Sequence, residues 1–158
     1  MYARDTALIA TPIGAIRITG DENQIISIRL EGGDAAPIGA RTAAVARAAE
    51  QLTDWFAGER SDFDLPLAPA ATPRGDALRQ GMVAIGYGET MSYGALARSI
   101  DSSPRAIGQA CARNPYPIVV PCHRILNADG SLGAYSAGNG PATKQWLLDH
   151  ERRHNEGM

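Results

Sequence analysis

The sequence has few of the features that mark a secreted or membrane-spanning protein. Its 158 residues include two cysteines, too few for a disulfide framework, and the spacing of Cys111 and Cys122 does not fit a metal site. No stretch approaches the roughly 20 apolar residues of a membrane-spanning helix, and the first residues lack the pattern of a signal peptide. We therefore expect a cytoplasmic protein with no membrane association, no metal and no cofactor.

Lysine is almost absent as well, because Lys144 is the only lysine among fifteen basic residues. The net charge of −2, taken over the whole chain, argues against a polyanionic partner. However, residues 1–73 carry six arginines against ten acidic residues, whereas residues 74–158 carry nine basic residues against seven acidic ones. The basic side chains are therefore concentrated in the second half of the chain.

The first half of the sequence has the alternating pattern of a β-sheet. Apolar residues alternate with polar ones over residues 6–30, with turn signals at 12–14 and 20–23, which predicts a three-stranded antiparallel meander. Apolar residues then recur at helical spacing between the possible cap Thr42 and Gly58, which predicts a helix on one face of the sheet. The proline-rich segment 65–73 interrupts both patterns, so we expect domains at 1–68 and 74–158.

The second half has a helical pattern. Apolar residues predict one helix over 78–85, a second beginning after the cap Ser92, and a third opening at Ser103 with proline in its first turn. Two short helices joined by a tight turn, the second with Arg105 near its start and Arg113 near its end, fit the outline of a helix-turn-helix. A plain helical hairpin fits the same outline.

The most informative run is Asn-Pro-Tyr-Pro-Ile-Val-Val-Pro-Cys-His-Arg-Ile at 114–125, which we interpret as an extended apolar strand leading to Cys122. A cysteine attacks as the thiolate, so its pKa must be lowered by a cation, a helix N-terminus or a hydrogen-bonded base. His123 and Arg124 supply such neighbours, although the imidazole would need a turn or a bridging water to reach the sulfur. A buried structural cysteine is the alternative, and we assign Cys111 to the core of its helix.

This run and its surroundings resemble the O6-alkylguanine-DNA alkyltransferases, also called methylated-DNA–protein-cysteine methyltransferases. The likeness rests on Pro-Cys-His-Arg at 121–124, Asn-Pro at 114–115 and Asp-Gly-Ser-Leu-Gly-Ala-Tyr-Ser at 129–136. Further matching residues are Lys144, Trp146, Leu147, Leu148 and Glu151, with 87–90 and 92–94 upstream and 11–14, 55–58 and 63–67 in the first half. The resemblance implies an α+β protein with a small N-terminal α/β domain, ribonuclease-H-like with an antiparallel sheet. Its C-terminal domain would be mainly helical, with a winged-helix-like helix-turn-helix.

The resemblance also implies a reaction. Such a protein flips O6-alkylguanine out of double-stranded DNA and transfers the alkyl group to its own Cys122, once per molecule and as a monomer. O4-alkylthymine is a further candidate substrate. His123 would relay the thiol proton through water to Glu151, which orients the imidazole, while Tyr93 would supply a proton to the leaving guanine. Asn114 would brace the turn that presents the cysteine.

The remaining implied site residues bind DNA or enclose the base. The implied DNA contacts are Arg105, which would fill the gap left by the flipped base, with Tyr93, Arg113 and Arg124. The implied base pocket consists of Pro117, Ile125, Tyr135 and Ser136. The alternative function is a lesion-binding sensor that keeps this fold but replaces the cysteine, and the presence of Cys122 favours transfer over sensing.

Several residues depart from the family's pattern. Arg74 and Arg79 replace residues that are normally large and apolar, Gly86 replaces a proline, and the interval before Arg105 is slightly short. We expect each substituted arginine to reach water, contact phosphate or form an ion pair, with an interdomain pair favoured. The His-Glu-x-x-His pattern at 150–154 also fits zinc peptidases, but it has no obvious third ligand.

Overall fold

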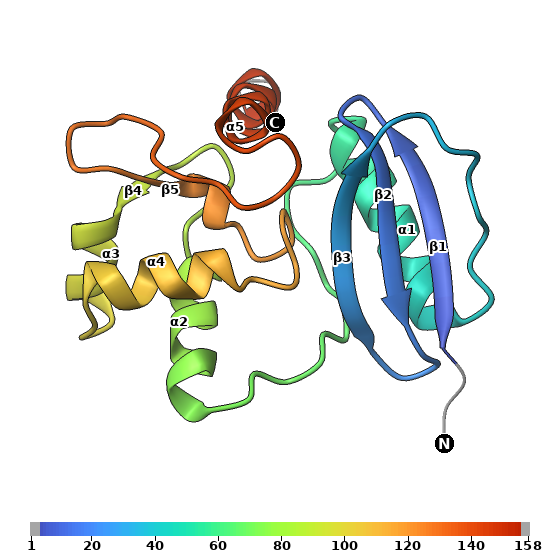
Figure 1. Cartoon of the computed structure of the whole chain (residues 1–158), viewed down its shortest axis with the longest axis horizontal. Helices are drawn as coiled ribbons and strands as arrows, with labels where there is room; N and C mark the ends of the chain where they lie inside the picture. The colour runs from blue at the N-terminus through green and yellow to red at the C-terminus, as the bar shows by residue number, and fades with distance from the viewer. Residues whose placement is uncertain (1–3, 156–158) are drawn as a thin grey trace. The chain divides into compact units, whose positions relative to one another are not determined.

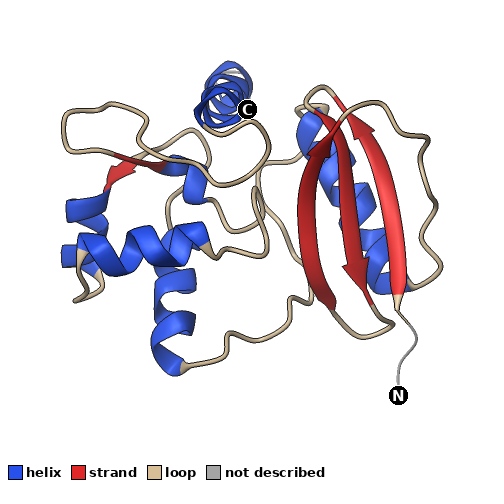
Figure 2. Cartoon of the chain, in the orientation of Figure 1, coloured by secondary structure: helices blue, strands red, loops and turns tan. Residues whose placement is uncertain are grey.

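The computed structural model describes residues 4–155 of the chain (Figure 1). The chain divides into two compact units, the first ending at Ala68 and the second beginning at Pro69. The first unit combines a sheet with one helix, whereas the second is mainly helical, so the predicted α+β class is confirmed (Figure 2). Within residues 4–155, no helix is both long enough and apolar enough to cross a membrane.

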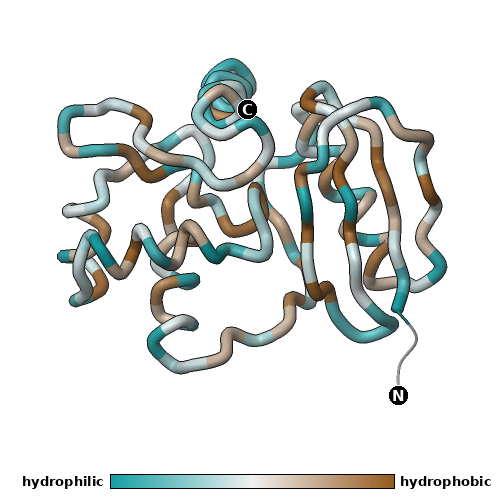
Figure 3. The backbone as a smooth tube through the Cα atoms, in the orientation of Figure 1, coloured by the Kyte–Doolittle hydropathy of each residue, from teal (hydrophilic) through white to brown (hydrophobic). Residues whose placement is uncertain are grey.

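The sheet of the first unit is the antiparallel meander that the alternation predicts. Its strands are β1 (Asp5–Thr11), β2 (Gly14–Gly20) and β3 (Ile25–Gly32), paired in the order β1-β2-β3. Apolar positions alternate with more polar ones along these strands (Figure 3). The turn between β1 and β2 requires glycine, because Gly14 has a φ of 98° and a Cβ there would lie 2.5 Å from the Cα of Gly32.

The helix of this unit, α1 (Ala43–Phe56), packs against β1 and β2. It begins where predicted, because the Thr42 hydroxyl accepts a hydrogen bond from the amide of Val45 at 3.3 Å. The buried carboxylate of Asp5 on β1 accepts two further bonds from Thr42, from its amide and its hydroxyl, both at 2.7 Å. These bonds fix the start of α1 to the edge of the sheet, while Leu52 and Trp55 are fully buried in the core.

The second unit holds four helices, a short strand pair and a single 3₁₀ turn among its described residues. The helices are α2 (Pro73–Val83), α3 (Tyr93–Ser99), α4 (Pro104–Ala112) and α5 (Pro141–Asn155). The strands β4 (Met91–Ser92) and β5 (Ile125–Leu126) pair in parallel, and β5 directly follows the 3₁₀ turn η1 (Cys122–Arg124). Because β4 leads directly into α3 and Ser92 pairs with Leu126, this pairing places the start of α3 at the end of β5.

The helix-turn-helix formed by α3 and α4 has the predicted capping residues. The hydroxyl of Ser92 accepts a hydrogen bond from the amide of Ala95 at 3.0 Å, and that of Ser103 accepts one from Ala106 at 3.1 Å. The two helices pack against each other, with Ile107 of α4 fully buried. The predicted helix-turn-helix is therefore confirmed as part of the fold.

The extended strand expected before Cys122 is wrong. Residues 115–120 form a turn in which the amide of Val120 donates to the carbonyl of Tyr116 at 2.8 Å. The prolines in this run lack the N–H that a strand would give to a neighbour, which explains why the apolar pattern misled. Ile118 has a φ of 76°, a value that β-branched residues rarely adopt, and its side chain is buried.

Candidate active site

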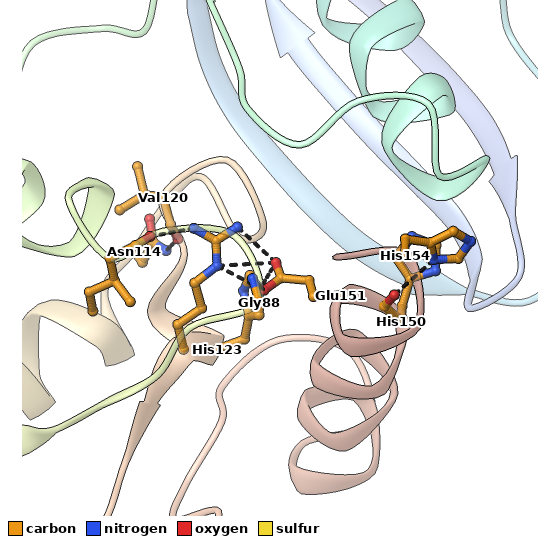
Figure 4. A network of polar contacts seen from close by, with 9 residues as sticks. Gly88, Asn114, Val120, His123, His150, Glu151 and His154 are labelled. Atoms are coloured by element: carbon orange, nitrogen blue, oxygen red, sulfur yellow. Dashed lines mark hydrogen bonds and ion pairs between the residues drawn. The ribbon is translucent and has the colours of Figure 1, made fainter. Parts of the chain in front are cut away.

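A buried ion cluster joins α5 to η1 in the second unit (Figure 4). Glu151 Oε2 lies 2.7 Å from His123 Nε2 and accepts a hydrogen bond from Arg124 Nη2 at 2.8 Å. Glu151 Oε1 accepts further bonds from Arg124 Nε at 2.9 Å and from the Gly88 amide at 3.2 Å. Arg124 Nη1 also donates to the carbonyl of Ile85. One carboxylate thus connects three segments that are distant in the sequence.

The charges of this cluster are set by burial and by its hydrogen bonds. Burial alone would raise the pKa of Glu151, but the hydrogen bonds and charges of His123 and Arg124 outweigh it and bring the pKa to about 2. Burial lowers the pKa of His123, although the contact with Glu151 opposes this shift. At neutral pH the cluster therefore holds a charged carboxylate and a neutral imidazole that is able to accept a proton.

The position of Arg124 does not fit the DNA contact expected from the sequence. Its side chain is only 7% exposed and is bound by Glu151 and by the carbonyl of Ile85. The planar guanidinium matches a carboxylate through several parallel hydrogen bonds, and once buried it needs that partner. We therefore assign Arg124 to the support of Glu151 and remove it from the DNA-binding surface.

Asn114 holds the turn that carries Cys122. Its side-chain amide donates to the carbonyl of Val120 at 2.9 Å and to the Cys122 sulfur at 3.3 Å. Its side-chain oxygen accepts a hydrogen bond from the amide of Tyr116 at 2.9 Å. The amide group of Asn114 thus fixes both the path of the backbone and the direction of the Cys122 sulfur. Cys122 itself is only 4% exposed.

The sulfur of Cys122 lies in surroundings that favour the thiolate. A hydrogen bond from the Cys111 thiol lowers the pKa of Cys122, while burial acts in the opposite direction. The hydrogen bond from Asn114 and the positive charge of Lys144 lower the pKa further. Lys144 is completely buried on α5, and its ammonium group donates to the carbonyls of Leu132 and Ala134.

Two tyrosines adjoin the pair of cysteines. Burial, with the nearby Cys111 and Cys122 sulfurs, raises the pKa of Tyr93 to about 12 and also raises the pKa of Tyr135. Both phenols therefore keep their protons at neutral pH and can serve as donors. The hydroxyl of Tyr135 is buried and makes no hydrogen bond to any of residues 4–155, which leaves it able to donate to a bound molecule.

The other residues expected in the base pocket differ in their burial. Pro117 and Ile125 are buried, which suits an apolar wall, whereas Ser136 is exposed. The hydroxyl of Ser136 donates to the carbonyl of Cys111 at 3.4 Å. The segment after Gly133 is thereby connected to the end of α4, on the same side as the two cysteines.

Both halves of the chain match a known protein family. Residues 6–69 match the model of the 6-O-methylguanine DNA methyltransferase ribonuclease-like domain, and residues 76–153 match that of the DNA binding domain of the same family. The constitutive methylated-DNA–protein-cysteine methyltransferase of Bacillus subtilis is 37% identical over 152 residues, which cover 90% of this chain and 92% of that protein. The chain belongs to the 6-O-methylguanine DNA methyltransferase family.

Solved structures of the family have the same fold. The crystal structure of Mycobacterium tuberculosis O6-methylguanine methyltransferase is 30% identical with a TM-score of 0.81, covering 96% of this chain and 94% of that one. The M. tuberculosis protein in complex with DNA is 32% identical with a TM-score of 0.79, covering 93% and 92%. A protein of Thermus thermophilus named a DNA base-flipping protein is 43% identical over 107 residues, 66% of this chain and 71% of that protein.

In this family member, the expected DNA contacts of α4 are available to a partner. Arg105 in its first turn and Arg113 at its C-terminal cap are both exposed. Arg74 on α2 donates to the Ser102 hydroxyl at 3.3 Å, and the guanidinium of Arg79 lies 5.3 Å from the centre of the Tyr116 ring. Both substituted arginines therefore have polar or aromatic neighbours within the second unit.

Sequence reasoning missed the effect of Cys111 on the pKa of Cys122. Cys111 shares the apolar side of α4 with Ile107, which is why it was assigned to the core, but it is only partly buried. Its thiol lowers the pKa of Cys122, and its sulfur lies 3.9 Å from the sulfur of Met82. A local pattern carries no signal of this effect, because it depends on how the turn at 115–120 folds back.

The motif at 150–154 has a different role from that of a zinc site. Glu151 faces His123, and the ring nitrogen Nδ1 of His154 lies 2.8 Å from the carbonyl of His150 (Figure 4). Among residues 4–155, no three histidine, cysteine or acidic side chains are grouped so that they could hold a metal ion.

Proposed function

We propose that this family member repairs alkylated double-stranded DNA by transferring the alkyl group from O6 of a flipped guanine to Cys122, once per molecule. It would act as a monomer in the cytoplasm. The observation that carries the proposal is a thiol of lowered pKa, held by Asn114 beside the buried pair of His123 and Glu151. Its relatives in the family, named methylated-DNA–protein-cysteine methyltransferases, support the same assignment.

The first step is removal of the thiol proton. The neutral imidazole of His123 accepts this proton through a bridging water, and the charge on Glu151 stabilises the imidazolium that forms. Asn114, the Cys111 thiol and Lys144 stabilise the negative charge left on the sulfur. Each of these groups is in place before substrate binds, so little reorganisation accompanies the reaction.

The second step is alkyl transfer. The sulfur attacks the alkyl carbon, a carbon–sulfur bond forms, the carbon–O6 bond breaks, and its electron pair stays on the guanine. Tyr93, whose raised pKa keeps its hydroxyl protonated, donates a proton to the guanine as it leaves. The free hydroxyl of Tyr135 donates to the edge of the base. The product is a thioether at Cys122, which has no route back to the thiol.

Access to the base requires extrusion from the duplex. Flipping costs a few kcal/mol, which must be offset by contacts to the distorted DNA. Arg105, exposed in the first turn of α4, would occupy the gap left by the base, and Arg113 would contact the backbone. O4-alkylthymine would enter the same pocket as a second substrate. Binding without transfer is the alternative, and the presence of Cys122 favours transfer.

Intact-mass spectrometry tests the proposed transfer directly. Incubation with duplex DNA containing O6-methylguanine is expected to add one methyl mass to the peptide with Cys122 and none to that with Cys111. Cys122→Ser is expected to abolish transfer and retain DNA binding, because a hydroxyl is a far poorer nucleophile. Product should stop at one equivalent per protein molecule. Turnover beyond one equivalent, or binding without any mass change, would exclude the mechanism.

A separate measurement tests the role of Arg105. Arg105→Ala is expected to slow repair in duplex DNA far more than dealkylation of free O6-benzylguanine, because only the duplex reaction includes the cost of flipping. Single-turnover rates on both substrates give the comparison, and Arg153→Ala, which removes an exposed arginine from α5, is the matched control. Equal losses of rate on the two substrates would show that Arg105 supports the pocket and does not fill the gap left by the flipped base.

A further inference from the structure

Three arginines line one groove between α2 and α4, which we call the arginine groove. Its volume is about 530 Å³, and the described residues that line it all belong to the second unit. Arg74 and Arg79 come from α2, whereas Arg113 is the C-terminal cap of α4. Leu78 and Met82, both buried, form part of its apolar lining. The arginine groove therefore combines three cationic side chains with an apolar surface.

Negative charge is missing from the lining of the arginine groove. None of the described residues that line it is acidic, because Asp76 of α2 is not among them and α4 contains no acidic residue. Arg74 donates to the Ser102 hydroxyl at 3.3 Å, and the guanidinium of Arg79 lies 5.3 Å from the centre of the Tyr116 ring. A serine hydroxyl and an aromatic ring orient a guanidinium without neutralising it. The groove therefore suits an anion.

The arginine groove lies next to the side of α4 that carries Arg105. The α4 residues of the groove have the i, i+3, i+4, i+7 spacing of one helix face, and they are Ala106, Gln109, Ala110 and Arg113. At 3.6 residues per turn, Arg105 is about a quarter turn from the centre of this face, whereas the buried Ile107 is on a different side. A helix with its side chains is roughly 10–12 Å wide, so the side next to an inserted one meets the phosphates that border the DNA groove.

We propose that the arginine groove binds the phosphate backbone of one DNA strand while α4 presents Arg105 to the duplex. This inference rests on the proposed function, which supplies double-stranded DNA as the partner. Arg74, Arg79 and Arg113 contact the phosphates through the forked hydrogen bonds of their guanidinium groups, and the apolar lining packs against deoxyribose carbons. Phosphate contacts of this kind fix the register and orientation of a protein on the duplex without reading its sequence.

The salt dependence of DNA binding tests this proposal. Fluorescence anisotropy gives the dissociation constant of the full-length protein for an undamaged duplex over a series of NaCl concentrations. Arg74→Ala and Arg79→Ala are each expected to reduce the slope of log K against log salt by about 0.9 in magnitude. These two variants are decisive, because Arg113 is already an expected DNA contact. Arg153→Ala, which removes an exposed arginine of α5, is the matched control and should keep the native slope.

Three results would overturn the proposal. The first is a native slope in both variants, which would leave alkyl transfer unaffected because undamaged DNA is bound without any transfer. If Arg79→Ala fails to fold by its melting temperature, Arg74→Ala decides alone, since Arg74 is exposed. The second is stabilisation of the native protein by inorganic pyrophosphate that Arg74→Ala loses while its DNA slope stays native, which would assign the groove to a free anion. The third is a native protein that binds no duplex, which would also exclude the proposed function.

Discussion

Replacing Glu151 with alanine is expected to lower the free energy of unfolding by about 3–5 kcal/mol, since it leaves Arg124 buried without its carboxylate. Urea denaturation followed by far-ultraviolet circular dichroism measures the change. Asp149→Ala is the matched control on the same helix, because the Asp149–Arg152 pair is exposed and its loss should change stability by only about 0.5 kcal/mol. A loss equal to that of the control would show that the buried cluster contributes little.

The same carboxylate predicts how stability depends on pH. Its pKa is about 2 in the folded protein and 4.5 for the free group, so the unfolded chain binds more protons between these values. Its contribution is therefore complete above about pH 4.5 and is lost as the pH falls towards 2. Glu151→Gln, which removes this titration, should show a shallower loss of stability over that range than the native protein does.

Replacing His123 with glutamine is expected to slow alkyl transfer by about 10²- to 10⁴-fold at neutral pH. Glutamine can still hydrogen-bond to Glu151 but cannot accept the thiol proton. The rate should recover as the pH rises, because hydroxide then removes the proton that the imidazole would have taken. Single-turnover kinetics across a pH series, on free O6-benzylguanine to avoid the flipping step, measure the effect.

Two controls distinguish loss of the base from loss of structure. The melting temperature of His123→Gln should remain close to that of the native protein, and its free O6-benzylguanine reaction should reach one full equivalent at high pH. If the variant is slowed equally at every pH, His123 does not act as the base, and its contact with Glu151 serves only to position the turn.

Features of the fold that depend on neighbouring residues could be predicted from the sequence. The helix starts after Thr42, Ser92 and Ser103 were correct because a capping bond spans only a few residues. The meander was correct because its alternation and turn signals lie within one segment. The strand predicted at 115–120 was wrong, because buried apolar residues suit a packed turn as well as a strand. Only the prolines distinguish the two.

The site was less predictable because its contacts are distant in the sequence. Cys122 and His123 form a recognisable motif, and the resemblance to the family pointed to Glu151. The burial of Arg124 depends on a carboxylate 27 residues away and on the carbonyl of Ile85, which no local pattern contains. Nothing near Cys111 in the sequence indicates that its thiol lowers the pKa of Cys122, so that effect required the three-dimensional structure.

The left-handed backbone of Ile118 means that the shape of its turn is imposed by the rest of the unit. A β-branched residue loses free energy at this φ, so residues 114–125 taken alone would relax to other conformations. The Asn114 bond to the sulfur would then be lost, and Cys122 would react as an ordinary thiol. The chemical reactivity of this one sulfur is therefore a readout of whether the whole second unit is folded.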